Sequence, residues 1–175
     1  SSIDSNFAYW GAGLYSEDSG FDIEKSNIRF NLAYIEGGAI YQNGNNMDIS
    51  ESAITSNTGL DFGGALVCYM GIMDLDRVTI AGNSSNYGSA FNMREAVITM
   101  SNSIVWENGV NMVYSSSSSQ ASMMNIGYTN FYGGESYLSA NASIILDWGN
   151  GNLVNDPLFC SVELNNFSLQ EGSSC

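Results

Sequence analysis

Hydrophobic and polar residues alternate in short runs along most of the chain, and the runs share three apolar columns. The first column holds Phe21, Met47, Met73, Ile98 and Met124, the second Ile23, Ile49, Leu75, Met100 and Ile126, and the third Ile28, Ile54, Ile80, Val105 and Phe131. One polar residue separates the first two columns, which is the period-2 pattern of a strand with one buried face. No window shows a comparable 3.6-residue stripe. We therefore predict an all-β fold in which helices are absent or short.

The runs recur at a fixed interval of 25 or 26 residues. Segment 37–57 is repeated by 63–83, preceded by 11–31 and followed by 88–108. A fixed period in this range indicates a solenoid, whereas a propeller blade needs about 40 residues. The period has room for three short strands and three turns. We therefore predict a right-handed parallel β-helix (a solenoid) with about seven coils of 25–26 residues.

In this interpretation residues 1–175 form a single domain. Residues 1–111 form regular coils, and 112–151 form irregular coils with loops because the Ser-rich stretch 115–119 breaks the pattern. Residues 152–175 are expected to form a closing coil. Ile3-x-x-Asn6 matches the tail of a coil, so the first coil presents an open edge. That edge suits either a segment of a longer protein or a copy of this chain docking end to end as a filament.

Asparagine recurs three residues after the third apolar column. The series comprises Asn6, Asn31, Asn57, Asn83 and Asn108. An asparagine repeated at one coil position can hydrogen-bond its neighbours above and below and satisfy turn backbone groups. We therefore expect these residues to form a structural ladder inside a turn.

The charge balance limits the class of partner. Four basic residues face eighteen acidic ones, which gives a formal net charge of −14. Nucleic acid is excluded as a partner because phosphate binding needs clustered Lys and Arg, and an anionic membrane surface is disfavoured for the same reason. No apolar run is long enough to span a bilayer. The chain has no histidine, which removes the commonest general base and the commonest zinc ligand.

Three aspartates share the polar column between the first two apolar columns. Asp22, Asp48 and Asp74 should stack on one outward face at about the strand spacing. Such a column is either a solvated ladder, a cation site suited to Ca²⁺, or a carboxylate pair of a polysaccharide-cleaving enzyme. Apart from this possible Ca²⁺ we expect no cofactor, and no residue is assigned a catalytic role.

The four basic residues divide into two pairs. Lys25 and Arg77 share a column with Glu51, and this alternation of charges predicts a salt-bridge ladder. Arg29 and Arg94 have no evident partner in the sequence. Either one could assist a carboxylate in catalysis, but no second feature of the sequence supports that role.

Tyr15 and Tyr41 occupy the same outward position after a glycine corner. An exposed row of aromatic rings is a possible contact surface for glycans. The alternative is that stacked rings pack on one another along the solenoid.

Cys160 and Cys175 bracket the last predicted coil, and we expect a disulfide between them, as in secreted chains. Cys68 has the parity of an inward-facing residue and is expected to be a core thiol.

The motifs GGAI (37–40) and GGAL (63–66), with the Ile-x-x-Asn series, resemble the GGA(I/L/V) and FxxN repeats of the polymorphic outer-membrane protein family. The Phe of FxxN is replaced here by Ile or Val. The C-terminal half, with NSIVWENG (102–109) and GNLVNDPLFC (151–160), resembles a module at the ends of secreted bacterial β-helix proteins. The resemblance implies an extracellular or cell-surface location and a role in adhesion.

Three functions remain open after these observations. The first is a non-enzymatic scaffold or adhesion segment that contacts other surface proteins or glycans. The second is a carbohydrate-binding or polysaccharide-cleaving β-helix, and the third is a self-assembling extracellular filament subunit. The first is favoured because the groups that catalysis would need are scarce in the sequence.

Overall fold

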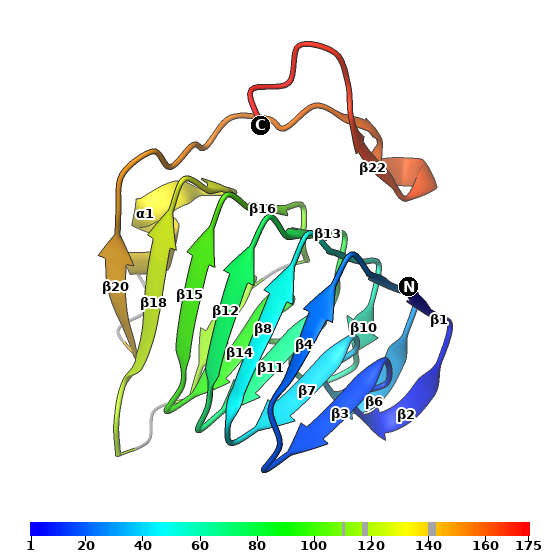
Figure 1. Ribbon diagram of the computed structural model, residues 1–175, viewed down its shortest axis with the longest axis vertical. Coiled ribbons are helices and arrows are strands. Elements are labelled where there is room, and N and C mark those ends of the chain that lie inside the picture. The colour runs from blue at the N-terminus through cyan, green and yellow to red at the C-terminus, as the bar shows by residue number, and fades with distance from the viewer. Residues whose placement is uncertain (110, 117–118, 140–142) are drawn as a thin grey trace.

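The computed structural model describes residues 1–109, 111–116, 119–139 and 143–175. Over most of this length the backbone winds into a parallel β-solenoid of about five turns (Figure 1). The all-β prediction and the parallel stacking are confirmed, and the coil count is lower than the seven expected. Among the described residues no helix is long and apolar enough to cross a membrane.

Four parallel sheets, named A to D in chain order, form the sides of the stack. Sheet A contains β1 (Ser2–Asp4), β5 (Asn27–Arg29), β9 (Ala53–Thr55), β13 (Thr79–Ala81), β16 (Ile104–Trp106) and β19 (Asn130–Phe131). Sheet B contains β2 (Phe7–Trp10), β6 (Leu32–Glu36) and β10 (Thr58–Gly59). Sheet C contains β3 (Leu14–Glu17), β7 (Ile40–Asn43), β11 (Leu66–Tyr69), β14 (Phe91–Arg94) and β17 (Val113–Ser115). Sheet D contains β4 (Phe21–Glu24), β8 (Asn46–Ser50), β12 (Ile72–Asp76), β15 (Val97–Ser101), β18 (Ser122–Gly127) and β20 (Ile144–Trp148).

The residues of each predicted apolar column lie directly over one another in the structure. Ile28 pairs with Ile54, and Ile54 pairs with Ile80, in register. All three side chains are at most 1% exposed. Burial of each such side chain contributes roughly 1.5–3 kcal/mol, so the inward rows account for much of the stability of the stack.

Glycines make the corner between sheets B and C. Gly37 and Gly63 have φ angles of 72° and 60°, a region that glycine enters without a steric penalty. A Cβ atom on Gly63 would lie 2.2 Å from Cγ2 of Val67, an outward-facing residue of β11. The corner therefore brings the outer faces of the two sheets close together.

The last coil is closed by a helix. In the chain α1 (Gly134–Ser139) lies between β19 and β20, where earlier coils have sheet B and C strands. Leu138 is buried in the core, and the Tyr137 hydroxyl accepts a hydrogen bond of 2.7 Å from the Met112 backbone N–H. This short helix covers the core at the C-terminal end of the stack.

Residues 152–175 were expected to form a closing coil, but they do not complete one. We call them the strap. The strap crosses the outer face of sheet A (Figure 1), where β21 (Phe159–Ser161) and β22 (Asn166–Leu169) pair antiparallel on either side of the 3-10 helix η1 (Val162–Leu164). Phe159 and Phe167 pack there against Ile104 and Trp106. The outer face of the late sheet A strands is apolar and the strap covers it, so residues 152–175 add no further coil to the stack.

The predicted disulfide is not formed in the structure. Cys160 and Cys175 are free and exposed. Cys160 follows Phe159, which faces the solenoid, so strand alternation turns the Cys160 thiol outward. Cys175 Sγ instead accepts a hydrogen bond of 3.0 Å from Asn130 Nδ2. Cys68 is fully buried as predicted, and burial raises the pKa of its thiol to about 12.

Candidate functional site

The asparagine ladder is present and continuous. The side-chain amides of Asn6, Asn31, Asn57 and Asn83 each donate to Oδ1 of the next asparagine, at 2.8–3.0 Å. The same Oδ1 atoms accept a backbone N–H from the coil below. Asn57 is fully buried. The ladder therefore stabilises the turn and has no side chain free for chemistry.

A second ladder, which the sequence reasoning missed, satisfies another turn. Ser52 Oγ accepts the Ser26 backbone N–H at 3.0 Å and donates to Ser50 O at 2.6 Å. Ser103 and Thr129 have the same role in later coils. The signal was a hydroxyl residue at 26, 52, 103 and 129, which follows the interval of the asparagines with Val78 as the exception.

The aspartate column lies on the outer face of sheet D. Asp22 pairs with Asp48, and Asp48 with Asp74, and all three are exposed. In the described part of the chain, no group of three His, Cys, Asp or Glu residues is placed to hold a metal ion. The Ca²⁺ site therefore stays a prediction that this geometry does not strengthen.

The predicted charge ladder forms at a neighbouring turn. The Glu51 carboxylate lies 3.3 Å from Arg77 and 3.8 Å from Lys25. These exposed ion pairs contribute at most about 1 kcal/mol each, so their role is structural.

The two remaining arginines lie on other faces than the aspartate column. Arg29 forms an ion pair of 3.2 Å with Asp4 on sheet A. Arg94, on sheet C, places its guanidinium 4.2 Å from the centre of the Tyr69 ring. A polysaccharide-cleaving site at Asp22, Asp48 and Asp74 would need an arginine and aromatic rings beside it, and the fold keeps them apart.

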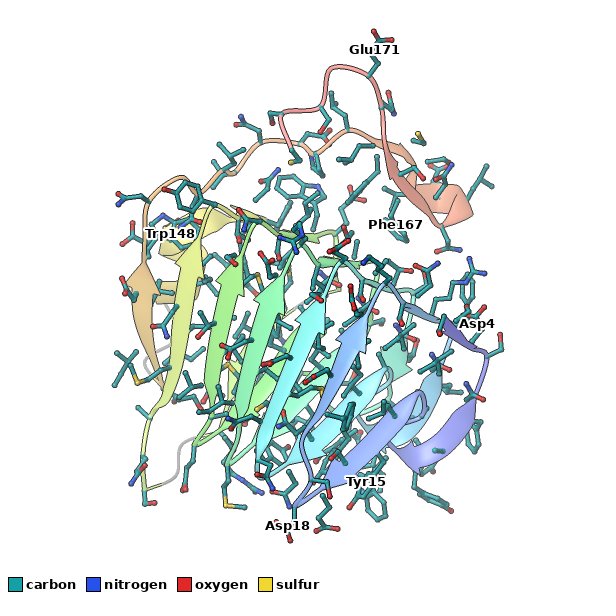
Figure 2. All side chains as sticks on the ribbon, in the orientation of Figure 1. Asp4, Tyr15, Asp18, Trp148, Phe167 and Glu171 are labelled. Atoms are coloured by element: carbon teal, nitrogen blue, oxygen red, sulfur yellow. The ribbon has the colours of Figure 1, made fainter. Side chains whose placement is uncertain are left out.

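Aromatic side chains gather instead where sheets B and C meet, and we call this site the aromatic corner. Its members are Tyr15, Tyr41, Phe62, Tyr69, Tyr87 and Tyr114, with Glu36 and Asn92. The rings of Tyr15 and Tyr41 stack with centres 5.1 Å apart and planes 6° apart, and Tyr69 meets Tyr41 edge-on at 5.7 Å. Tyr15 projects from β3, on the far side of the stack from Phe167 (Figure 2).

The later coils continue the same cluster. Phe62 and Tyr87 extend sheet B through isolated bridges, and Tyr114 belongs to β17 of sheet C. These three rings contact one another with centres 5.2–5.7 Å apart. Val67 and Asn92 face outward from sheet C, yet they are 0% and 1% exposed. The rings therefore bury part of an outer sheet face, as the packing alternative predicted, while Tyr15 stays 49% exposed.

A hydrogen-bonded chain crosses the corner from sheet C to sheet B. Asn92 Nδ2 donates to the Tyr69 hydroxyl at 2.7 Å, and that hydroxyl donates to Glu36 Oε2 at 2.8 Å. Burial raises the pKa of the half-buried Glu36 carboxyl, although the Tyr69 hydrogen bond and the Arg94 charge oppose this shift. Burial also raises the pKa of Tyr69. Glu36 is therefore a candidate functional residue that the sequence did not indicate.

A second carboxylate lies at the exposed side of the corner. The Tyr15 hydroxyl donates a hydrogen bond of 2.9 Å to Glu17 Oε2, which raises the Tyr15 pKa. The pKa of Tyr41 is raised mainly by burial, next by the Glu36 charge, and more weakly by Glu17. Glu36 and Glu17 therefore act on the same tyrosine hydroxyl.

Sequence columns could have found only part of this site. Asn43, Tyr69 and Arg94 occupy one outward column at the repeat interval, so the placement of Arg94 beside Tyr69 was accessible. Glu36 and Tyr69 belong to different columns on different sheets, and only the glycine corner joins them. No spacing in the sequence indicates that Glu36 and Tyr69 are in contact.

Comparison with protein-family models, with characterised proteins and with solved structures finds no match. The class of the molecule therefore rests on its own geometry. It is a parallel β-solenoid with an aromatic, acid-lined corner between two of its sheets.

Proposed function

We propose that this solenoid is a non-enzymatic extracellular or cell-surface scaffold whose aromatic corner binds glycans in adhesion. The observation that carries the proposal is the parallel stack of Tyr15 and Tyr41, one coil apart and open to solvent at Tyr15. The exposed Tyr15 ring, held flat against Tyr41, offers an apolar surface to a sugar at a small cost in entropy. Carboxylates beside them can accept hydrogen bonds from sugar hydroxyls.

The sequence resemblance supports the same role from a different direction. The GGAI and GGAL motifs and the Ile-x-x-Asn series resemble repeats of the polymorphic outer-membrane protein family, which implies adhesion at a cell surface. In the structure these motifs build the glycine corner and the asparagine ladder that hold the aromatic corner in shape. Glycans or other surface proteins are the proposed partners.

A glycan array with purified protein tests this proposal. The native chain should bind a defined set of glycans, and Tyr15→Ala combined with Tyr41→Ala should abolish that binding. Tyr128→Ala is the control, because Tyr128 is an exposed tyrosine on a turn that follows sheet D. The proposal fails if no glycan binds, or if the double variant binds as well as the native chain.

The filament alternative has one specific observation in its favour. β1, β2, β3 and β4 each lie at the edge of their sheet in the described chain, so one side of each is available to another strand. Either a preceding segment of a longer protein or another copy could pair there. Light scattering at high concentration separates the two, because a monomer argues against copies adding end to end.

A further inference from the structure

The aromatic corner holds hydrogen-bond acceptors that have no donors. Asn43 Oδ1 and Asn92 Oδ1 are buried and find no partner among the described residues. Both side chains lie on the outer face of sheet C, because Asn43 pairs with Tyr69 and Asn92 pairs with Tyr114. A buried acceptor without a donor costs about 1–3 kcal/mol. The outer face of sheet C is thus rich in acceptors, and the exposed acceptor beside it is Glu17, which pairs with Asn43. A ligand that brings hydrogen-bond donors suits this face.

The charge of the corner points to the kind of donor. Glu17 accepts a hydrogen bond from Tyr15 and Glu36 accepts one from Tyr69, and the Tyr41 ring contacts both of these tyrosines. Glu36 uses Oε2 to accept from Tyr69, and its other oxygen makes no hydrogen bond within the described part of the chain. Arg94 brings one positive charge to the Glu36 end of the corner, and Asp61 brings a further negative one. With Glu17, Glu36 and Asp61 against one guanidinium, in a chain of net charge −14, this surface repels an anionic ligand and attracts a cation.

The ring faces suit a cation as well. Arg94 already places its guanidinium 4.2 Å from the Tyr69 ring centre, so the chain itself uses one face of the corner in a cation–π contact. No basic side chain of the described residues lies over Tyr15 or Tyr41. Tyr41 is enclosed between the Tyr15 and Tyr69 rings, so the exposed Tyr15 ring is the one left for a ligand.

We propose that the aromatic corner binds a sugar unit bearing a cationic primary amine, with the sugar ring against Tyr15 and the amine drawn to the carboxylates of the corner, Glu17 and Glu36. This inference rests on the proposed glycan-binding function and names its ligand class. A neutral acetamido sugar offers no charge to the carboxylates. A uronic acid is repelled by them.

The test compares two chemically matched oligosaccharides by calorimetric titration. One is an oligomer of β-1,4-linked glucosamine, and the other is its fully N-acetylated counterpart of the same length. We expect the amine form to bind at least about tenfold more tightly, because each charge-assisted hydrogen bond is about twice as strong as a neutral one. Binding should also weaken when the pH falls far enough to protonate the Glu36 carboxyl, which accepts a hydrogen bond from Tyr69 and is acted on by the charges of Arg94 and Asp61.

Single charge-neutralising variants locate the site. Glu36→Gln and Glu17→Gln should each weaken amine binding by about tenfold. Glu171→Gln changes the net charge equally at the tip of the strap, far from Tyr15 (Figure 2), and should leave affinity unchanged. Circular dichroism melting of each variant checks that the solenoid is folded.

The outcomes separate this inference from the function on which it rests. If the acetylated oligomer binds as tightly as the amine form, the amine proposal is overturned while glycan binding stands. If Glu171→Gln weakens binding as much as Glu36→Gln, the attraction is general electrostatics and the amine proposal is again overturned. If neither oligomer nor any arrayed glycan binds, both proposals fall.

Discussion

The Tyr69 hydroxyl donates a hydrogen bond of 2.8 Å to Glu36 Oε2, which joins a residue of β11 on sheet C to a residue of β6 on sheet B. The two strands belong to successive coils and to different sheets. The contact exists because the glycine corner folds the outer faces of these sheets toward each other. It places a carboxylate in a partly desolvated setting that a flat sheet face would not provide.

The raised pKa of Glu36 predicts a pH-dependent stability. The folded protein holds this proton to a higher pH than the unfolded chain, so stability falls as pH rises from the unfolded pKa through the folded pKa. Glu36→Gln removes that penalty and keeps a neutral acceptor for Tyr69. We expect Glu36→Gln to melt at a higher temperature than the native chain at pH 7 and to show no gain at pH 4. A gain of equal size at both pH values would contradict the ionisation argument.

The asparagine ladder predicts a large loss of stability from a single internal residue. Asn57→Ala leaves the backbone N–H of Asn31 and the carbonyl of Ile28 without their partners in a fully buried turn. We expect a loss on the order of 3 kcal/mol or more in the free energy of unfolding, measured in urea. Asn46→Ala, at an exposed asparagine of β8, should change it by less than about 0.5 kcal/mol. Similar losses in both variants would mean that a ladder asparagine contributes no more to the free energy of unfolding than an exposed asparagine does.

The strap is predicted to detach without unwinding the solenoid. Phe167 packs against Phe159, with ring centres 5.3 Å apart, and joins it on the apolar outer face of sheet A. Phe167→Ala should speed amide hydrogen exchange in residues 159–169 and leave the exchange of β8 and β12 unchanged. Leu164→Ala, at an 81% exposed side chain, is the matched control. Faster exchange throughout the stack would show that the strap and the coils unfold together.

The three cysteines are predicted to differ in reactivity toward iodoacetamide in the native, unreduced protein. Cys160 and Cys175 are exposed and should be alkylated, whereas Cys68 is buried with a pKa of about 12 and should react only after denaturation. Mass spectrometry of the digested protein reads each site. Protection of both Cys160 and Cys175 that disappears on reduction would restore the disulfide that the sequence suggested.

The columns of the solenoid could be predicted from sequence because the repeat interval alone decides which residues stack. Ile28, Ile54 and Ile80, the asparagines and the Glu51 ladder follow from that interval. The strap could not be predicted, because its packing against Trp106 on the outer face of sheet A follows no column of the repeat. The predicted disulfide is absent from the structure, in which strand alternation at Phe159 turns Cys160 outward. The Glu36–Tyr69 contact could not be predicted from any column, because it joins two different sheets across the glycine corner.

The aromatic corner forms only if outward residues one coil apart lie directly over each other. Asp48 and Asp74 face each other on β8 and β12, and paired residues of adjacent strands are close enough for a disulfide. In a chain with Cys68→Ala, Cys160→Ser and Cys175→Ser, the pair Asp48→Cys and Asp74→Cys should cross-link on mild oxidation. The displaced pair Asp48→Cys and Asp76→Cys should not. Equal cross-linking of both pairs, or of the displaced pair alone, would contradict the register on which the aromatic corner and its ligand depend.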